Sequence, residues 1–352
     1  MKKLLAILLA AATLPLAACG GTVAHVANIE DKKPWAATGT GSYEKCVYDI
    51  ERRDITRSGD DQIIATGTYT TEVEVESDER TVVSASFTLT YVDDERAGSS
   101  RGLTDTYVAA CAFATTGAHP IYSYRAMTLA PRADETRNNS YTIVANYASA
   151  EAAVPAPSGD VILPARTSRI TWHGESADLA IDASGQVFDN EQLYYILRAF
   201  TNIDEEQSET FRLSNLFDAH NAGSFSAHDM SVSVAENRET LFVSPDFTRY
   251  STTSQNDRGE EVESIELDGN EDNPRAKLDC LVGTVGMTSS NPGPSQTVYF
   301  SDIPFRVDEV GNTTTKVIVR IVTREYSGAT EKYNMIYHLK EYSVLKENSV
   351  SA

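Results

Sequence analysis

A strict alternation of residue types between positions 69 and 91 constrains the fold of this chain more than any other feature. Apart from a polar break at Ser77–Arg80, every second residue suits a protein core, and most residues between them are polar. The core-facing set is Tyr69, Thr71, Val73, Val75, Val83, Ala85, Phe87, Leu89 and Tyr91. Successive side chains of a β-strand point to opposite faces of the sheet, so the pattern predicts an antiparallel hairpin with one buried face.

Similar alternation recurs along most of the chain. A second long hairpin is expected around Ser327–Thr330, where two strands rich in Val, Ile and Tyr flank a short polar turn. No repeat with a fixed period of 20–50 residues is present, which argues against a propeller or a solenoid. Besides the first hairpin, strands are predicted at residues 104–115, 121–130, 140–148, 166–173, 229–235, 240–245, 262–267, 277–286, 297–301, 315–325 and 332–344.

One helix interrupts the strands, over residues 189–200. Asp189 followed three residues later by Gln192 is typical of a capping box at a helix start. We expect this helix to cover a sheet with its apolar stripe. The alternative is that it lines a lipid-sized cavity, with Tyr194 and Tyr195 at the mouth. The stripe consists of Leu193, Ile196, Leu197 and Phe200.

These elements predict a mainly β protein. We expect a large curved antiparallel sheet, an open half-barrel, with a minor helical insertion near residues 189–200. A second short helix is expected over 210–217. The alternative is two β-sandwich domains, because the small and proline-rich segment 148–159 suits a linker. The pattern resembles the open half-barrels of periplasmic lipoprotein carriers and other β-rich envelope lipoproteins.

The amino terminus carries an export signal. Two lysines precede an apolar run that is shorter than the roughly 20 residues needed to span a bilayer, which is typical of a secretory signal peptide. The run ends in Leu16-Ala17-Ala18-Cys19, which resembles the lipobox of bacterial lipoproteins. The resemblance implies cleavage between Ala18 and Cys19 and attachment of lipid to Cys19. The alternative is an ordinary signal peptide whose cleavage site precedes a free cysteine.

This resemblance also predicts the organisation of the chain and its place in the cell. Residues 1–18 are the signal peptide, 19–36 an acylated flexible tether, and 37–347 a β-rich extracytoplasmic domain, with an alternative internal boundary near 150–160. The protein is then lipid-anchored in the cell envelope, at the cell surface or on the periplasmic side of an outer membrane. Its membrane partner is reached through the acyl chains on Cys19, since two or more chains are needed for stable anchoring.

The net charge of the chain excludes one class of binding partner. The formal net charge is −21 at pH 7, whereas nucleic-acid binding requires clustered Lys and Arg. We therefore expect no nucleic-acid partner. A small molecule, a lipid or a protein remains as the ligand class.

Three cysteines remain besides Cys19, namely Cys46, Cys111 and Cys280. They allow at most one disulfide, and the sequence does not choose among the three pairings. None lies in a Cys-x-x-Cys motif, so a redox or zinc site has little support. Cys111 alternates with Ala109 and Phe113, which predicts a buried thiol on a strand.

Two segments deserve comparison with metal sites. The loop containing His220 and His228 is where histidines and acids gather, but a zinc site requires three or four converging ligands. The segment Asp268–Asp279 has the oxygen spacing of a calcium loop, but Asn273 occupies the sixth position, where such a loop needs Gly. We expect a hairpin turn there, and neither a metal nor a cofactor.

No catalytic motif supports an enzyme. The chain lacks a Gly-x-Ser-x-Gly elbow, and the segment His173–Ser176 is typical of a turn. The first hypothesis is therefore a membrane-anchored binding or structural envelope protein. The second is a carrier of a hydrophobic ligand in a curved-sheet cavity, and the third is an extracytoplasmic hydrolase. A cavity of several hundred Å³ between sheet and helix would favour the carrier.

Overall fold

The computed structural model describes most of the chain after residue 42. The predicted signal peptide, the predicted tether and Cys19 lie outside the described residues. The described ranges are 43–56, 62–77, 79–92, 102–129, 140–182, 187–199, 208–235, 238–243, 251–255, 261–266, 276–287, 295–304, 314–327 and 330–345.

The first half of the described chain is built from antiparallel strands. Their bounds are β1 (Tyr43–Asp54), β2 (Gln62–Ser77), β3 (Arg80–Tyr91), β4 (Thr104–Ala114), β5 (Pro120–Thr128), β6 (Tyr141–Asn146), β7 (Ala152–Val154), β8 (Val161–Leu163), β9 (Thr167–Trp172) and β10 (Glu175–Ala180).

The second half contains the helices and the remaining strands. These are β11 (Phe188–Asp189), the 3₁₀ turn η3 (Asn190–Gln192), α2 (Leu193–Ala199), β12 (Ser208–Ser214), α3 (Leu216–Ala222), β13 (Ala227–Val234), β14 (Glu239–Val243), β15 (Ser251–Gln255), β16 (Glu261–Glu266), β17 (Ala276–Met287), β18 (Gln296–Pro304), β19 (Thr314–Ser327) and β20 (Thr330–Leu345).

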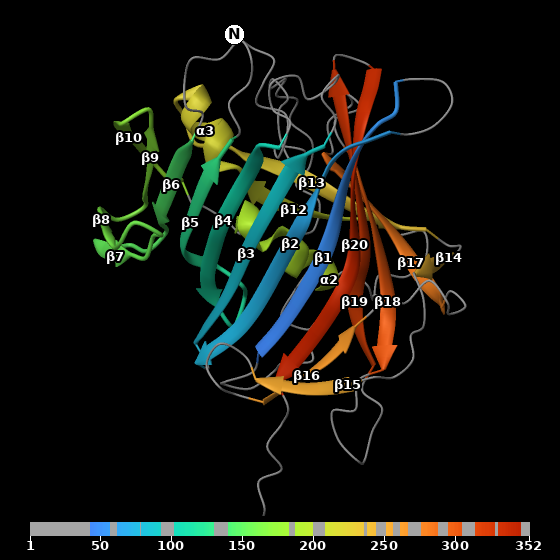
Figure 1. The fold of residues 1–352 in the computed structure, drawn as a ribbon. Coiled ribbons are helices and arrows are strands. Elements are labelled where there is room, and N and C mark those ends of the chain that lie inside the picture. The colour runs from blue at the N-terminus through green and yellow to red at the C-terminus, as the bar shows by residue number, and fades with distance from the viewer. Residues whose placement is uncertain are drawn as a thin grey trace, which may run out of the picture.

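Eighteen of these strands form one large curved sheet. From one edge, successive neighbours run β10–β9–β6–β5–β4–β3–β2–β1–β20–β19–β18–β17–β13–β12–β11. β14 also pairs with β17, and β16 joins β20 to β15. Figure 1 shows this sheet curving around α2, which lies behind β1 and β2. The predicted open half-barrel with a helical insertion is confirmed.

Both predicted hairpins are present. In the first, Tyr69 pairs with Phe87 and Val73 with Val83, so the core-facing residues of β2 and β3 lie on one face. In the second, Ile321 pairs with Tyr337 across the turn between β19 and β20. All sheet pairings are antiparallel except the short β11–β12 pair, which makes the sheet mixed rather than purely antiparallel.

The first and last described strands are neighbours. β1 pairs with β20 from Glu44 opposite Val344 to Asp54 opposite Tyr333. This pairing joins the two ends of the domain in the middle of the sheet. On the concave side, the core packs around α2, where Ile196 is completely buried.

The predicted helix over 210–217 is wrong in its first half. Residues 208–214 form strand β12, in which the buried side chains of Phe211 and Leu213 alternate with period two. The helix α3 begins only after Asn215, whose side chain accepts hydrogen bonds from the backbone N–H groups of Phe217 and Asp218. The asparagine cap therefore sets the boundary between strand and helix.

The two-sandwich alternative is also wrong. β6 and β9, which flank residues 148–159, pair with each other in the same sheet, from Tyr141 opposite Trp172 to Asn146 opposite Thr167. The connection contains the small β7–β8 ribbon. Residues 148–159 therefore form a connection within one continuous sheet and not the linker of that alternative.

The strands on either side of Asp268–Asp272 do not support the hairpin turn expected there. These residues lie outside the described ones, but the flanking strands are described. β16 pairs with β15 and β20, whereas β17 pairs with β13, β14 and β18.

The turn at His173–Ser176 is confirmed, because His173 (φ 55°) and Gly174 (φ 80°) form the two-residue loop between β9 and β10.

Candidate functional site

The start of the internal helix is fixed by a buried carboxylate. Asp189 forms the predicted capping box with Gln192, and its side chain accepts a hydrogen bond from the N–H of Glu191 at 2.8 Å. The same carboxylate accepts the hydroxyl of Ser123 on β5 at 2.8 Å and the hydroxyl of Tyr147. Asp189 therefore ties the helix start to the sheet at several points.

A buried ion pair lies beside this cap. Arg125 on β5 donates through Nε to Glu191 Oε1 at 2.8 Å, and its Nη2 contacts the same oxygen. Tyr107 on β4 donates its hydroxyl to the other carboxylate oxygen. Burial raises the pKa of Glu191 to about 8, while the adjacent guanidinium favours the charged carboxylate. Burial and the arginine therefore act on the pKa of Glu191 in opposite directions.

A second buried ion pair holds the other end of α2. Arg198 contacts both carboxylate oxygens of Glu44 on β1, and its Nη2 lies 3.2 Å from Oε2. Tyr342 on β20 donates its hydroxyl to Glu44 Oε2 at 2.9 Å. The side chains of Arg198 and Glu44 are only 6% and 2% exposed. The helix is thus connected to the sheet by charge at both ends.

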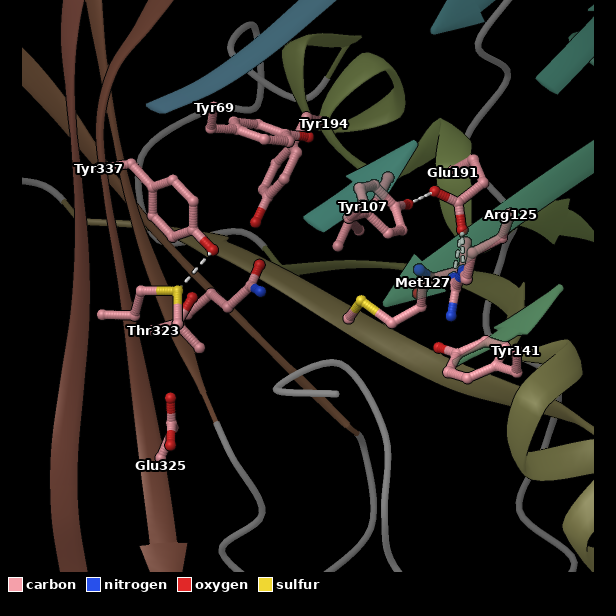
Figure 2. A pocket seen from close by; sticks show the side chains of 14 residues that line it. Tyr69, Tyr107, Arg125, Met127, Tyr141, Glu191, Tyr194, Thr323, Glu325 and Tyr337 are labelled. Carbon is pink, nitrogen blue, oxygen red and sulfur yellow. Dashed lines mark hydrogen bonds and ion pairs between the residues drawn. The ribbon is translucent and has the colours of Figure 1, made fainter. Parts of the chain in front are cut away.

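Between the helix and the concave face lies a small cavity, which we call the tyrosine cavity. Its volume is ≈ 80 Å³. Figure 2 shows labelled tyrosines on opposite sides of it, with Arg125 and Glu191 on one side and Tyr337 on the other. The lining residues are Tyr69, Tyr107, Arg125, Met127, Tyr141, Asn190, Glu191, Leu193, Tyr194, Gln296, Thr323, Glu325, Met335 and Tyr337.

Three of the tyrosine rings form a contiguous aromatic wall. The Tyr69 ring packs edge-on against Tyr337, with centroids 5.4 Å apart, and against Tyr194, with centroids 6.1 Å apart. The hydroxyl of Tyr337 donates to the Met335 sulfur at 2.9 Å. Burial raises the pKa of Tyr69, Tyr194 and Tyr337, so these phenols stay neutral at physiological pH.

Two buried acceptors of the lining have no hydrogen-bond donor among the residues that the structure describes. They are Oε1 of Gln296 on β18 and Oδ1 of Asn190 in η3. Gln296 is only 7% exposed. A buried carbonyl oxygen without a donor is costly, so a ligand or solvent donor at these atoms is favourable.

The structure resolves the questions left open for other residues. Tyr194 lines the tyrosine cavity, whereas Tyr195 borders a smaller space of ≈ 30 Å³ and packs on Phe113. Cys46, Cys111 and Cys280 are buried, and these three form no disulfide with one another. The predicted burial of Cys111 is confirmed. Burial also raises the pKa of the Cys46 thiol to about 12, which makes it unreactive.

The histidine loop is divided between two elements. His220 on α3 lies 2.9 Å from the hydroxyl of Ser168, while His228 lies on β13. Ser168 is completely buried, and neither it nor His220 lines the two spaces beside α2. Within the described ranges, no three potential metal ligands of the His, Cys, Asp or Glu types come together.

Several residues of the tyrosine cavity were not identified from the sequence. Arg125, Glu191 and Gln296 are single polar residues in strands or at a helix start, and their inward orientation depends on sheet pairing. The available signal was at β5, where Ser123, Arg125 and Met127 occupy the core-facing phase of the alternation.

Among the described residues, no helix combines the length and the apolar character needed to cross a bilayer.

Comparison with known proteins yields a structural similarity but no family. No protein family matches it, and no curated protein matches its sequence. It is similar to the crystal structure of a β-barrel-like protein of domain of unknown function DUF1849 from Brucella abortus, with 10% identity and a TM-score of 0.40. The match covers 87% of this chain and 98% of that one. The fold class rests on the strands and their pairings, which form a mainly β, open half-barrel with an internal helix.

Proposed function

We propose that this protein is a lipid-anchored, extracytoplasmic binding protein of the cell envelope. The tyrosine cavity is its binding site, and a small polar ligand is its target. The observation that carries this proposal is the cavity itself, which is ≈ 80 Å³ in volume and lined by tyrosines, an ion pair and two buried acceptors without donors.

A hydrophobic carrier has less support. Pockets that enclose drug-sized or larger ligands measure roughly 300–1,000 Å³ and are mostly apolar. The spaces on the two sides of Tyr194 are ≈ 80 Å³ and ≈ 30 Å³, and both are bordered by buried charges. A long acyl chain would therefore have to displace α2 and separate its ion pairs.

Native mass spectrometry tests the choice between these two functions. Residues 22–352, exported behind a cleavable signal peptide that has no lipobox, are expected to show no retained acyl lipid. Stoichiometric retention of a lipid would contradict the binding of small polar ligands and favour the carrier. Denatured samples provide the control, because their mass defines the chain free of non-covalent ligands.

The anchor is a separate part of the proposal and rests on Leu16-Ala17-Ala18-Cys19. Cys19→Ser removes the thiol to which lipid would be attached, so the variant is expected to leave the membrane fraction or to remain as uncleaved precursor. Fractionation followed by measurement of the intact mass distinguishes these outcomes. Cys46→Ser is the matched control and is expected to stay membrane-bound. A Cys19→Ser protein that is cleaved and still membrane-bound would refute the anchor.

A further inference from the structure

We propose that the tyrosine cavity recognises a small primary alkylammonium group, that is, an organic cation that carries N–H donors. This inference rests on the proposed function and specifies its ligand class. The ammonium group is the part that enters the cavity. Four features of the lining support it: unpartnered acceptors, aromatic rings, charge and size.

The unpartnered acceptors favour a ligand that carries hydrogen-bond donors. Oε1 of Gln296 and Oδ1 of Asn190 are buried, and no described residue donates a hydrogen bond to either. An ammonium group has three N–H donors and no acceptor. It therefore supplies the missing donor to an oxygen that it contacts, and hydrogen bonds that involve a charged group are stronger than neutral ones.

The aromatic wall also favours a positively charged ligand. The rings of Tyr69, Tyr194 and Tyr337 border the cavity, and their mutual edge-on packing orients ring faces in several directions. A cation is attracted to the face of an aromatic ring, more strongly when both are removed from water. Figure 2 shows these three residues grouped on one side of the site.

The charged residues of the lining leave no cation available for an anionic ligand. Arg125 is the lining arginine, and both its Nε and its Nη2 contact Glu191 Oε1. Glu325 adds a second carboxylate and is held by Arg52 at 2.8 Å, outside the lining. Both glutamates of the lining are thus paired with arginines, and these guanidinium groups are already engaged by carboxylates.

The volume restricts the ligand to a small group. A void of about 10–15 Å³ holds one water, so ≈ 80 Å³ has room for a few groups of that size. An ammonium nitrogen with one or two carbons matches this space. A larger molecule would place only its amine end in the cavity.

Isothermal titration of the purified full chain with ethylammonium chloride tests the inference. Separate titrations with sodium acetate and with glycerol test an anion and a neutral polar molecule. Saturable binding of ethylammonium is expected. Tetramethylammonium, which has no N–H donor, is expected to bind at least about tenfold more weakly. Equal affinity for the two cations would overturn the inference without any substitution being made.

Variants locate the site. Gln296→Met keeps the length of the side chain but removes the acceptor, so it should weaken ethylammonium binding by about tenfold or more. Gln62→Met, at an exposed position on β2, is the matched control and should leave binding unchanged. Equal binding by both variants would overturn the assignment to this cavity.

The ligand panel and the native mass spectrum distinguish failure of the ligand class from failure of the proposed binding function. Saturable binding of acetate or glycerol without binding of ethylammonium would overturn the ligand class and leave the proposed binding function intact. A retained acyl lipid in the native mass spectrum would instead overturn the proposed function.

Discussion

Arg198→Met is expected to lower the free energy of unfolding by about 3–5 kcal/mol. The substitution removes the partner of Glu44, whose side chain is only 2% exposed, and leaves its carboxylate buried without a counter-charge. Removing one member of a buried pair costs more than the pair itself contributes, because the remaining charge stays desolvated. Urea denaturation followed by circular dichroism measures the change as a lower midpoint.

Arg169→Met is the matched control for this prediction. Arg169 contacts Asp178 through two hydrogen bonds of 2.6 and 2.8 Å, but their side chains are 33% and 43% exposed. Exposed ion pairs contribute about 0–1 kcal/mol, so the control should shift the midpoint little. Equal effects of the two substitutions would show that Arg198 and Glu44 are not a buried pair in solution.

Gly67→Ala is expected to destabilise the sheet by about 3 kcal/mol or more. A Cβ atom at this position would lie 1.8 Å from the carbonyl oxygen of Thr88 and 2.9 Å from Cα of Leu89. Both atoms belong to the backbone of β3, so relief of the clash requires the strands to move apart. Gly67 also pairs with Ile50 on β1, which limits movement in the other direction.

Gly286→Ala is the corresponding control. Gly286 lies on β17, and a Cβ atom there would have no neighbour within 4 Å. Its substitution should change stability by less than about 1 kcal/mol, because Ala is also less flexible than Gly in the unfolded chain. Denaturation midpoints of the two variants, measured side by side, check the difference. Similar midpoints would contradict the close approach of β2 and β3 at Gly67.

Local pattern explains why much of the fold was predictable. The alternation in β2 and β3 specifies both strands and their hairpin, since partners such as Tyr69 and Phe87 are close in sequence. The helix start was equally local, because Asp189 and Gln192 are three residues apart. In contrast, Phe211, Leu213, Leu216 and Phe217 fit a helix or a strand, and the Asn215 cap decides between them.

Long-range pairing explains why the candidate site was not predictable. Arg125, Glu191 and Gln296 lie far apart in sequence, and each is compatible with a solvent-facing position. They line the same cavity only because β5, η3 and β18 surround the concave side of one sheet. The pairing of β1 with β20, which brings Glu44 next to Tyr342, likewise has no local signal.

The central claim is that α2 is a fixed part of the half-barrel, so that the concave side is a small polar site and not an acyl-chain cavity. Amide hydrogen exchange tests this directly. We expect the amides of Ile196 and Leu197 to exchange with opening free energies similar to those of the central strands β2 and β3. Rapid exchange of these helix amides, while the strands remain protected, would show that α2 opens independently and would contradict the account.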